Sequence, residues 1–248
     1  MPNKTRPSLI SGGHRGAESE FGRCAKRWGI DQTTLSFEGH AMEWPVGVKV
    51  LGETELAAGD ISMEIVSKRM GRTYHEADLI RRVIQSLYHM VNGSWQVFAI
   101  GWIQPDDTVK GGTGWGVELA KLFNRQVWVF DQQRNDWFTW TDGRWKPEVP
   151  KIGDRAFAGT GTRNLSDEGR AAIQALFERS FGPAKFRHKK VSAQRENGWL
   201  TLPTTACDRP GTTSSSLCQR RGMFESVGYG FRRHRVRSAL EVRGGCLN

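Results

Sequence analysis

The chain has 248 residues and a formal net charge of +10, with 38% hydrophobic and 25% charged residues, which is the composition of an ordinary globular protein. No apolar run approaches the roughly 18 residues of a membrane-spanning helix, so the sequence excludes a membrane span. The first residues lack the apolar segment of a secretory signal, and we therefore expect a cytoplasmic protein.

The first half of the chain alternates short apolar segments with amphipathic ones. We expect strands over residues 8–10, 33–37 and 96–100, and helices over residues 17–28 and 61–70 and from Thr73 onward. The helix from Thr73 begins with a capping-box spacing, Thr73 and Glu76. An apolar stripe from Ile80 to Val91 then follows the 3.6-residue period of a helix.

The same alternation continues to residue 180. We expect a helix at about Val117–Phe123, strands over residues 127–130 and 155–159, and a last helix capped by Ser166. Residues 137–145 predict a hairpin turned at Asp142-Gly143, with tryptophans that form either a surface patch or a dimer contact. Strands that alternate with helices predict an α/β fold, a three-layer Rossmann-like domain with a mainly parallel sheet.

The composition changes after Pro183. Residues 184–248 hold thirteen basic and four acidic residues, so they carry nearly all of the net charge. We expect one domain over residues 1–183 and a low-order basic tail over residues 184–248. The tail is either an accidental extension of the chain or a functional segment. If the protein binds nucleic acid, we expect it to do so only through this tail.

The cysteines and histidines do not form a metal-binding pattern. Cys24 lies in the domain and Cys207, Cys218 and Cys246 in the tail, without a C-x-x-C pair or a histidine at zinc-ligand spacing. We therefore predict no metal site, no cofactor and no disulfide in a reducing compartment.

Three glycine-rich loops each follow an expected strand and precede an expected helix. The first glycine loop is residues 11–18, the second is residues 111–118 and the third is residues 159–163. In a parallel sheet all three lie at the carboxyl edge, where backbone N–H groups of glycine loops and helix N-termini bind phosphate. The predicted binding residues are Gly12, Gly13, Arg15, Gly16, Gly111, Gly112, Thr113, Gly114, Trp115, Gly159, Thr160, Gly161 and Arg163. His14 and His40 also lie near this edge and are further candidates for contact with the ligand.

The second loop resembles the GGxGTxxE motif of the LOG proteins, and the first resembles the SGG turn of the wider SLOG group. The third loop and its helix resemble the opening element of that fold, although they come last in this chain. This order is similar to a circularly permuted SLOG domain, like the molybdenum-cofactor carrier proteins. Trp115 stands where the LOG motif has Thr, and it either stacks on a ligand or fills the pocket.

The resemblance to LOG enzymes implies a homodimer and a phosphoribohydrolase, which cleaves the N-glycosidic bond of a nucleoside 5′-monophosphate. Glu118 matches the motif carboxylate, and Arg81 or Arg82 on the preceding helix corresponds to the family's arginine. Our leading hypothesis from the loops is binding of a nucleotide or a nucleotide-derived phosphoryl ligand. The alternatives are the phosphoribohydrolase, with Glu118 and Arg81 or Arg82 as catalytic residues, and a nucleic-acid-associated protein that acts through its tail.

Overall fold

The computed structural model describes residues 6–74 and 77–184. The strands are β1 (Ser8–Ser11), β2 (Asp31–Ser36), β3 (Val48–Val50), β4 (Gln96–Gly101), β5 (Gln126–Asp131), β6 (Asp136–Thr141), β7 (Arg144–Pro147) and β8 (Ala156–Gly161). The helices are α1 (Ala17–Trp28), α2 (Glu53–Ala57), α3 (Asp60–Met70), α4 (Asp78–Asn92), α5 (Thr113–Leu122) and α6 (Asp167–Phe181).

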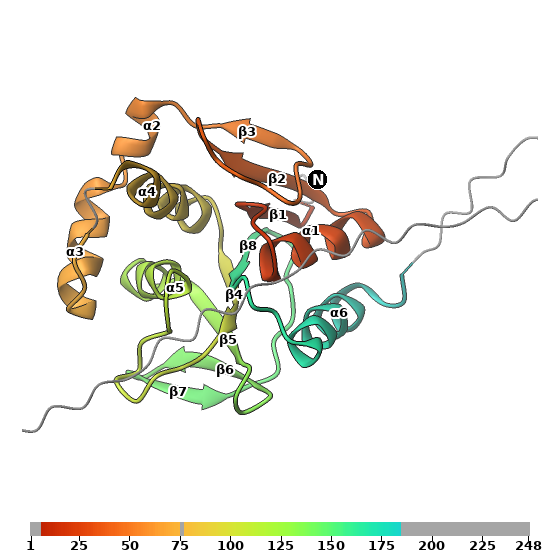
Figure 1. Ribbon diagram of the computed structural model, residues 1–248. Helices are drawn as coiled ribbons and strands as arrows, with labels where there is room; N and C mark the ends of the chain where they lie inside the picture. The colour runs from red at the N-terminus through yellow and green to blue at the C-terminus, as the bar shows by residue number, and fades with distance from the viewer. Residues whose placement is uncertain (1–5, 75–76, 185–248) are drawn as a thin grey trace, which may run out of the picture. The chain divides into compact units, whose positions relative to one another are not determined.

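The strands form one eight-stranded sheet in the order β3-β2-β1-β8-β4-β5-β6-β7 (Figure 1). All neighbours from β3 to β5 are parallel, and the hairpin of β6 and β7 adds two antiparallel strands at one edge. The predicted α/β class with a mainly parallel sheet is confirmed.

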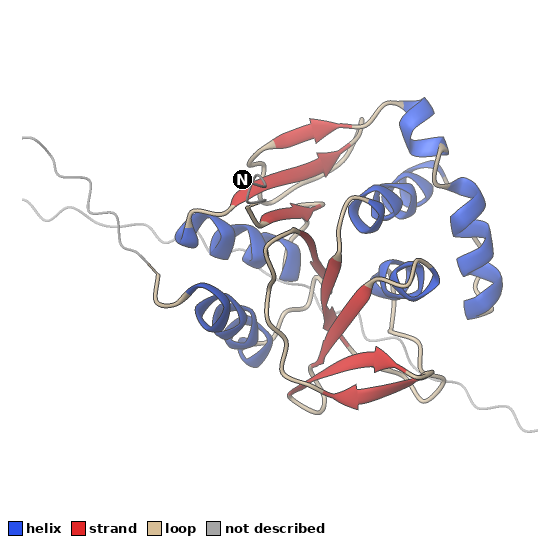
Figure 2. Ribbon diagram, turned by 180° about the vertical axis from the view of Figure 1, so that it is seen from behind, coloured by secondary structure: helices blue, strands red, loops and turns tan. Residues whose placement is uncertain are grey.

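Helices cover both faces of the sheet, which gives three layers (Figures 1 and 2). One hydrophobic core lies under α1 and α6 and includes Phe21, Phe157 and Phe177, all fully buried. The other core lies under α2, α3, α4 and α5 and includes Met63 and Leu119, which are also fully buried. Because both faces are buried, β4 and β5 contain continuous apolar runs, as expected for central parallel strands.

Two short elements were not predicted, and two helices begin several residues before or after the expected position. β3 and α2 were not predicted, because they have only three and five residues and so show no clear period. β3 forms by pairing its exposed residues with β2. α4 begins at Asp78 with Ala77 as its N-cap, not at Thr73, and Glu76 of the expected capping box lies outside the described residues. α5 begins at Thr113, inside the second glycine loop rather than after it.

The position of β8 brings the loops together. Although it is the last strand in the chain, β8 lies in the centre of the sheet between β1 and β4. The carboxyl ends of three adjacent strands, at Ser11, Gly161 and Gly101, therefore lie side by side at one edge of the sheet. The loops that follow these three strands are the three glycine loops, the second of them after an intervening turn.

The described part of the chain ends at Ala184, just after α6. The predicted tail, apart from Ala184 itself, lies outside the described residues, and the division into a domain and a tail stays a prediction. Within the described residues, no helix combines the length and the apolar character needed to cross a bilayer.

Candidate functional site

A cavity of about 1070 Å³ lies where the three glycine loops meet. Each loop contributes to its wall, so segments about 150 residues apart in the chain surround one space. Eight of the predicted binding residues line it: Gly12, Gly111, Gly112, Thr113, Trp115, Thr160, Gly161 and Arg163. A large concave pocket with convergent polar groups is the usual form of a small-molecule site.

The first loop holds a buried carboxylate against this cavity. Glu18, in the first turn of α1, turns back onto its own loop and accepts hydrogen bonds at Oε2 from the backbone N–H (3.1 Å) and Nδ1 (2.9 Å) of His14. Its Oε1 accepts a hydrogen bond of 2.9 Å from Thr160 Oγ1, at the end of β8. Glu18 therefore joins the first loop to the third.

Hydrogen bonding keeps this carboxylate ionised. Burial by itself raises the pKa of Glu18, but the hydrogen bonds and charge of His14 and the hydroxyl of Thr160 outweigh it and hold the pKa below its ordinary value of 4.5. A carboxylate that accepts several hydrogen bonds is stabilised in its charged form.

This depressed pKa predicts a pH-dependent contribution to stability. The contribution of Glu18 should be complete above its unfolded pKa of about 4.5 and should be lost as the pH falls through the lower folded pKa. Urea unfolding at pH 7, 5 and 4 should therefore show that Glu18→Gln destabilises the protein less at pH 4 than at pH 7. Glu178→Gln removes an exposed carboxylate on α6 and serves as the control. An equal loss for Glu18→Gln at all three pH values would contradict the prediction.

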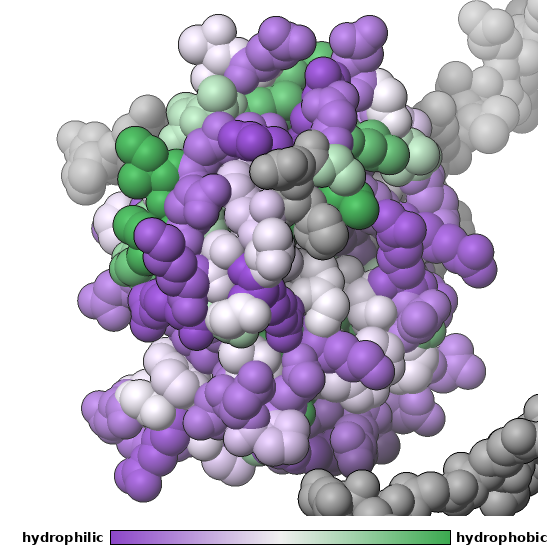
Figure 3. Space-filling model, turned by 60° about the vertical axis from the view of Figure 1, so that its left-hand side comes forward, coloured by the Kyte–Doolittle hydropathy of each residue, from purple (hydrophilic) through white to green (hydrophobic). Residues whose placement is uncertain are grey.

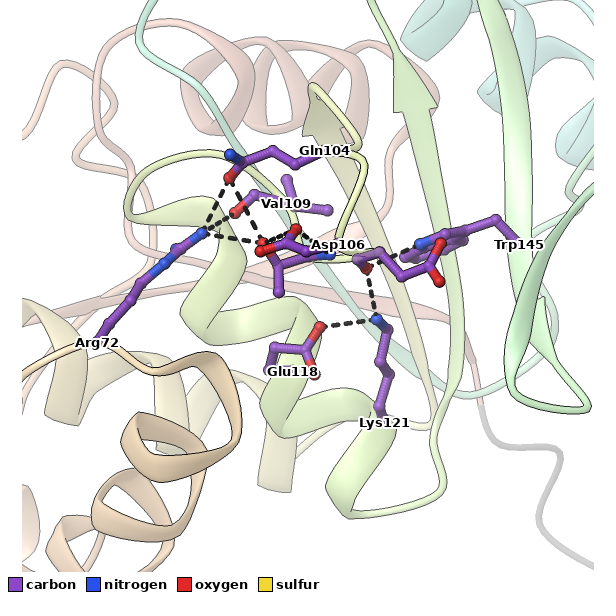
Figure 4. A network of polar contacts seen from close by, with 9 residues as sticks. Arg72, Gln104, Asp106, Val109, Glu118, Lys121 and Trp145 are labelled. Atoms are coloured by element: carbon purple, nitrogen blue, oxygen red, sulfur yellow. Dashed lines mark hydrogen bonds and ion pairs between the residues drawn. The ribbon is translucent and has the colours of Figure 1, made fainter.

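Arg72 shapes the second loop from the other side of the cavity. Its guanidinium donates to the side chains of Gln104 and Thr108 and to the backbone carbonyl of Val109 (Figure 4), and also to the backbone carbonyl of Gly111, all at 3.0 to 3.1 Å. The turn between β4 and α5 is thus fastened to the segment that follows α3. Arg72 also lines the cavity.

Three cationic side chains that line the cavity have no ion-pair partner within the part of the chain that the structure describes. Arg72, Lys110 and Arg163 all line it. Among the described residues, none of the three forms an ion pair with a carboxylate. The acceptors of Arg72 are all neutral, and Lys110 lies 5.9 Å from the centroid of the Trp102 ring. Cations in this state favour an anionic ligand.

α4 supplies an apolar wall. The hydrophobic residues of this helix that line the cavity are Ile80, Val83, Ile84, Leu87 and Met90. Trp115 is only 5% exposed and packs 5.9 Å from the ring of Tyr74, so most of its surface belongs to the core. The cavity therefore has cationic, glycine-lined ends and a hydrophobic side, which suits a ligand with both an anionic and an apolar part.

We compared the chain with known proteins. No family model matches the sequence, and no curated protein matches it. A crystal structure of a "Putative molybdenum carrier protein" from Syntrophus aciditrophicus SB is similar at a TM-score of 0.42 and 14% identity, over 71% of this chain and 94% of that one. At these values the likeness carries no information about the cavity.

Four predicted glycines do not line the cavity but allow close packing around it. A Cβ at Gly13 would lie 2.8 Å from the carbonyl oxygen of Trp44, and one at Gly159 would lie 2.6 Å from the ring of Phe21. Gly16 packs against the third loop and Gly114 against the backbone of Val109. Arg15, the fifth predicted residue outside the wall, is exposed.

The proposed catalytic residues also lie outside the cavity wall. Glu118 forms an ion pair of 2.7 Å with Lys121, and both side chains are buried (Figure 4). Arg81 pairs with Asp60 at 2.8 Å. Arg82 pairs with Asp78 at 3.0 Å on its own helix. None of the three predicted catalytic residues lines the cavity.

Lys121 is the partner that occupies Glu118. Its Nζ lies 3.7 Å from the centroid of the Trp140 ring and 4.7 Å from that of Trp145, and it donates to the carbonyl of Asp107. Burial lowers the pKa of Lys121, although Glu118 and the hydrogen bond between them act in the opposite direction. The hairpin tryptophans thus enclose an internal ion pair.

The cavity also includes residues that the sequence analysis did not select. These are chiefly Glu18, Arg72, Lys110 and the apolar residues of α4. Glu18 is the last residue of the first glycine loop, so the sequence motif could have identified it as a site residue. Arg72 follows the glycine that ends α3, and no local pattern connects it with a loop some 40 residues later.

Proposed function

We propose that the domain binds a small molecule with a phosphoryl group, such as a nucleotide, in the cavity between the glycine loops. The observation that carries the proposal is the convergence of all three loops and three unpaired cations on one cavity. If the glycines only formed the turns between strands and helices, there would be no reason for the three loops and the three cations to surround the same cavity.

The phosphoryl group would bind at the second loop. α5 begins there, with Gly112 as its N-cap, and the first N–H groups of a helix together with its dipole favour a bound anion. Arg72 and Lys110 lie beside this N-terminus and would add charge-assisted hydrogen bonds. The apolar part of the ligand, such as a base, would then lie against α4.

Binding should be measurable as a thermal shift with a panel of AMP, GMP, CMP, UMP and inorganic pyrophosphate. Gly112→Trp should abolish the shift, because Gly112 lines the cavity and a Cβ there would meet no atom within 4 Å, so the indole can be accommodated at the wall and would compete with the ligand for space. Gly52→Trp is the matched control, since Gly52 is also a helix N-cap with open space around it. If no member of the panel shifts the unfolding temperature of the wild type, the proposal is rejected.

The phosphoribohydrolase alternative is weaker than simple binding. It requires Glu118 and Arg81 or Arg82 beside the scissile bond, and these side chains are engaged in ion pairs outside the cavity wall. The proposal is therefore a binding site, without an assigned reaction. A homodimer, a cytoplasmic location and nucleic-acid binding through residues 184–248 stay predictions.

A further inference from the structure

A second cavity, the amino-edge pocket, lies at the edge of the sheet opposite the glycine loops. It has a volume of about 420 Å³, in the usual range for small-molecule sites, and Trp95, Arg125 and Arg155 line it. Each of these residues directly precedes a strand, which is β4, β5 and β8 respectively. Because β8, β4 and β5 are parallel neighbours (Figure 1), the three residues lie side by side where these strands begin.

The two arginines of the pocket lie over one exposed indole. Trp95 is 53% exposed, and the centroid of its ring is 4.2 Å from Cζ of Arg155 and 5.4 Å from Cζ of Arg125. A guanidinium over an aromatic ring makes this contact with its face, while its N–H groups lie in the guanidinium plane and can still donate to an acceptor. The indole therefore orients two cations without using their hydrogen bonds.

The protein itself neutralises little of this charge. Within residues 6–74 and 77–184, neither Arg125 nor Arg155 forms an ion pair. Arg125 donates from Nη2 to the carbonyl of Asn92 at 3.2 Å, and its buried Nε has no hydrogen-bond partner in the same part of the chain. Asp154 also lines the pocket, and this one carboxylate opposes two guanidiniums. The pocket is therefore suited to an anion.

Hydrogen bonds of one glutamine hold the walls of the pocket together. Oε1 of Gln96, the first residue of β4, accepts from the N–H of Gly153 at 2.7 Å. Its Nε2 donates to Oε1 of Gln126, the first residue of β5, and to the carbonyl of Lys151, both at 3.2 Å. The segment before β8 is thus fixed to β4 and β5, and a site that is already ordered loses less conformational entropy when a ligand binds.

The position of the pocket favours carboxylates over phosphate. None of the described residues that line it belongs to a helix N-terminus, the feature that favours phosphate at the other edge. Instead α4 and α5 end just before Trp95 and Arg125, and the C-terminal end of a helix carries partial negative charge. The two arginines precede strands on opposite sides of β4, about 10 Å apart in the sheet. Two separate carboxylates, each planar like a guanidinium, match this arrangement better than one tetrahedral group.

We propose that the amino-edge pocket binds a short dicarboxylate, with one carboxylate on Arg125 and the other on Arg155. The carbon chain between the carboxylates lies along the exposed indole of Trp95. The pocket shares no lining residue with the cavity between the glycine loops, so this inference is independent of the proposed function.

Indole N–H signals in a ¹H–¹⁵N spectrum of the full chain would test the inference. Each of the ten tryptophans gives one such signal, and Trp95→Phe assigns that of Trp95. We expect succinate or glutarate, added at constant ionic strength, to shift the Trp95 signal to saturation. Butyrate is the matched control, since it has the carbon skeleton of succinate with one carboxylate. The signal of Trp28 should not move, because its ring lies under Arg27, at 5.7 Å, outside both cavities.

Arg125→Gln and Arg155→Gln should each weaken the binding of the dicarboxylate about tenfold, through loss of a charge-assisted hydrogen bond. Arg27→Gln removes another arginine that lies over a tryptophan and should leave the affinity unchanged. The other indole signals show whether each variant is folded.

The inference is overturned if butyrate or inorganic phosphate shifts the Trp95 signal with the affinity of succinate. It is also overturned if the shift does not saturate, or if a folded protein with both arginine substitutions binds as the wild type does. Trp102 lines the other cavity, so its signal in a titration with AMP reports on the proposed function separately. A Trp102 signal that stays unchanged with AMP would count against that function and leave the dicarboxylate site standing.

Discussion

Replacing Gly16 with alanine should lower the free energy of unfolding by about 3 kcal/mol or more, from backbone strain and steric overlap together. Gly16 precedes α1 with φ of +94°, a conformation that residues with a Cβ rarely adopt. A Cβ there would also lie 2.5 Å from the carbonyl oxygen of Thr162 and 2.6 Å from that of Arg163. Both are backbone atoms of the segment that follows β8, and they cannot move aside as a flexible side chain could.

Gly29→Ala separates strain from overlap. Gly29 ends α1 with φ of +69°, but a Cβ at this position would meet no atom within 4 Å. Its replacement should cost only about 1 kcal/mol, the penalty for a left-handed conformation. Urea unfolding of both variants would measure the difference, and equal losses would show that the contact between the first and third loops is not as close as described.

Lys121→Met should cost about 3 to 5 kcal/mol, because it leaves the carboxylate of Glu118 buried without a partner. Glu118 is 6% exposed, and its hydrogen bond to Lys121 Nζ is 2.7 Å long. Methionine has nearly the length of lysine and can still pack between Trp140 and Trp145, so the loss reports mainly on the charge. The free energy of unfolding at pH 7 is the quantity to measure.

A double-mutant cycle completes this test. Glu118→Gln combined with Lys121→Met should be less destabilised than the sum of the single variants, because neither charge then remains buried alone. If Glu118 has this structural role, Glu118→Gln should keep the nucleotide-induced thermal shift and its ligand preference. Loss of binding in a folded Glu118→Gln protein would instead indicate that Glu118 contacts the ligand.

The local elements of this fold could be read from the chain with few errors. Ser166 accepts a hydrogen bond from the N–H of Gly169 as the predicted N-cap of α6, and Gly29 ends α1. The hairpin turns at Asp142-Gly143, both with positive φ. These features depend on a few neighbouring residues, and so the local sequence is sufficient. β3 and α2 depend instead on what they pack against, and no local signal announces them.

The candidate site residues also differ in whether local sequence or tertiary packing determines their role. Glu18 lies in the first turn of α1 and Glu118 in the second turn of α5, both on helices that follow glycine loops, and the sequence alone does not show which of them faces a ligand. In the structure one is bound to a lysine between two tryptophans, and the other faces the cavity with His14. Lys121 lies one turn further along α5 and pairs with Glu118, and Trp140 and Trp145 of the β6–β7 hairpin lie against its Nζ.

The distribution of hydrophobic residues on the surface does not by itself indicate a further functional site. On the face in Figure 3, hydrophobic residues form small separate groups among hydrophilic ones, although the exposed large hydrophobic side chains include Ile61, Ile65, Leu79 and Ile80. Single exposed apolar residues are normal on a globular domain. The evidence for functional sites therefore comes from the cavities and not from the exposed hydrophobic residues.

The sequence by itself determined the α/β class, the three glycine loops and the position of most of the net charge beyond residue 183, because each is a matter of local pattern or composition. Only the tertiary structure decided which charges act together. Arg72, Lys110 and Arg163 meet at one cavity because β8 inserts between β1 and β4, and this pairing between strands about 150 residues apart leaves no trace in local sequence. The net charge of +10 is thus less informative than three unpaired cations that the fold places around one space.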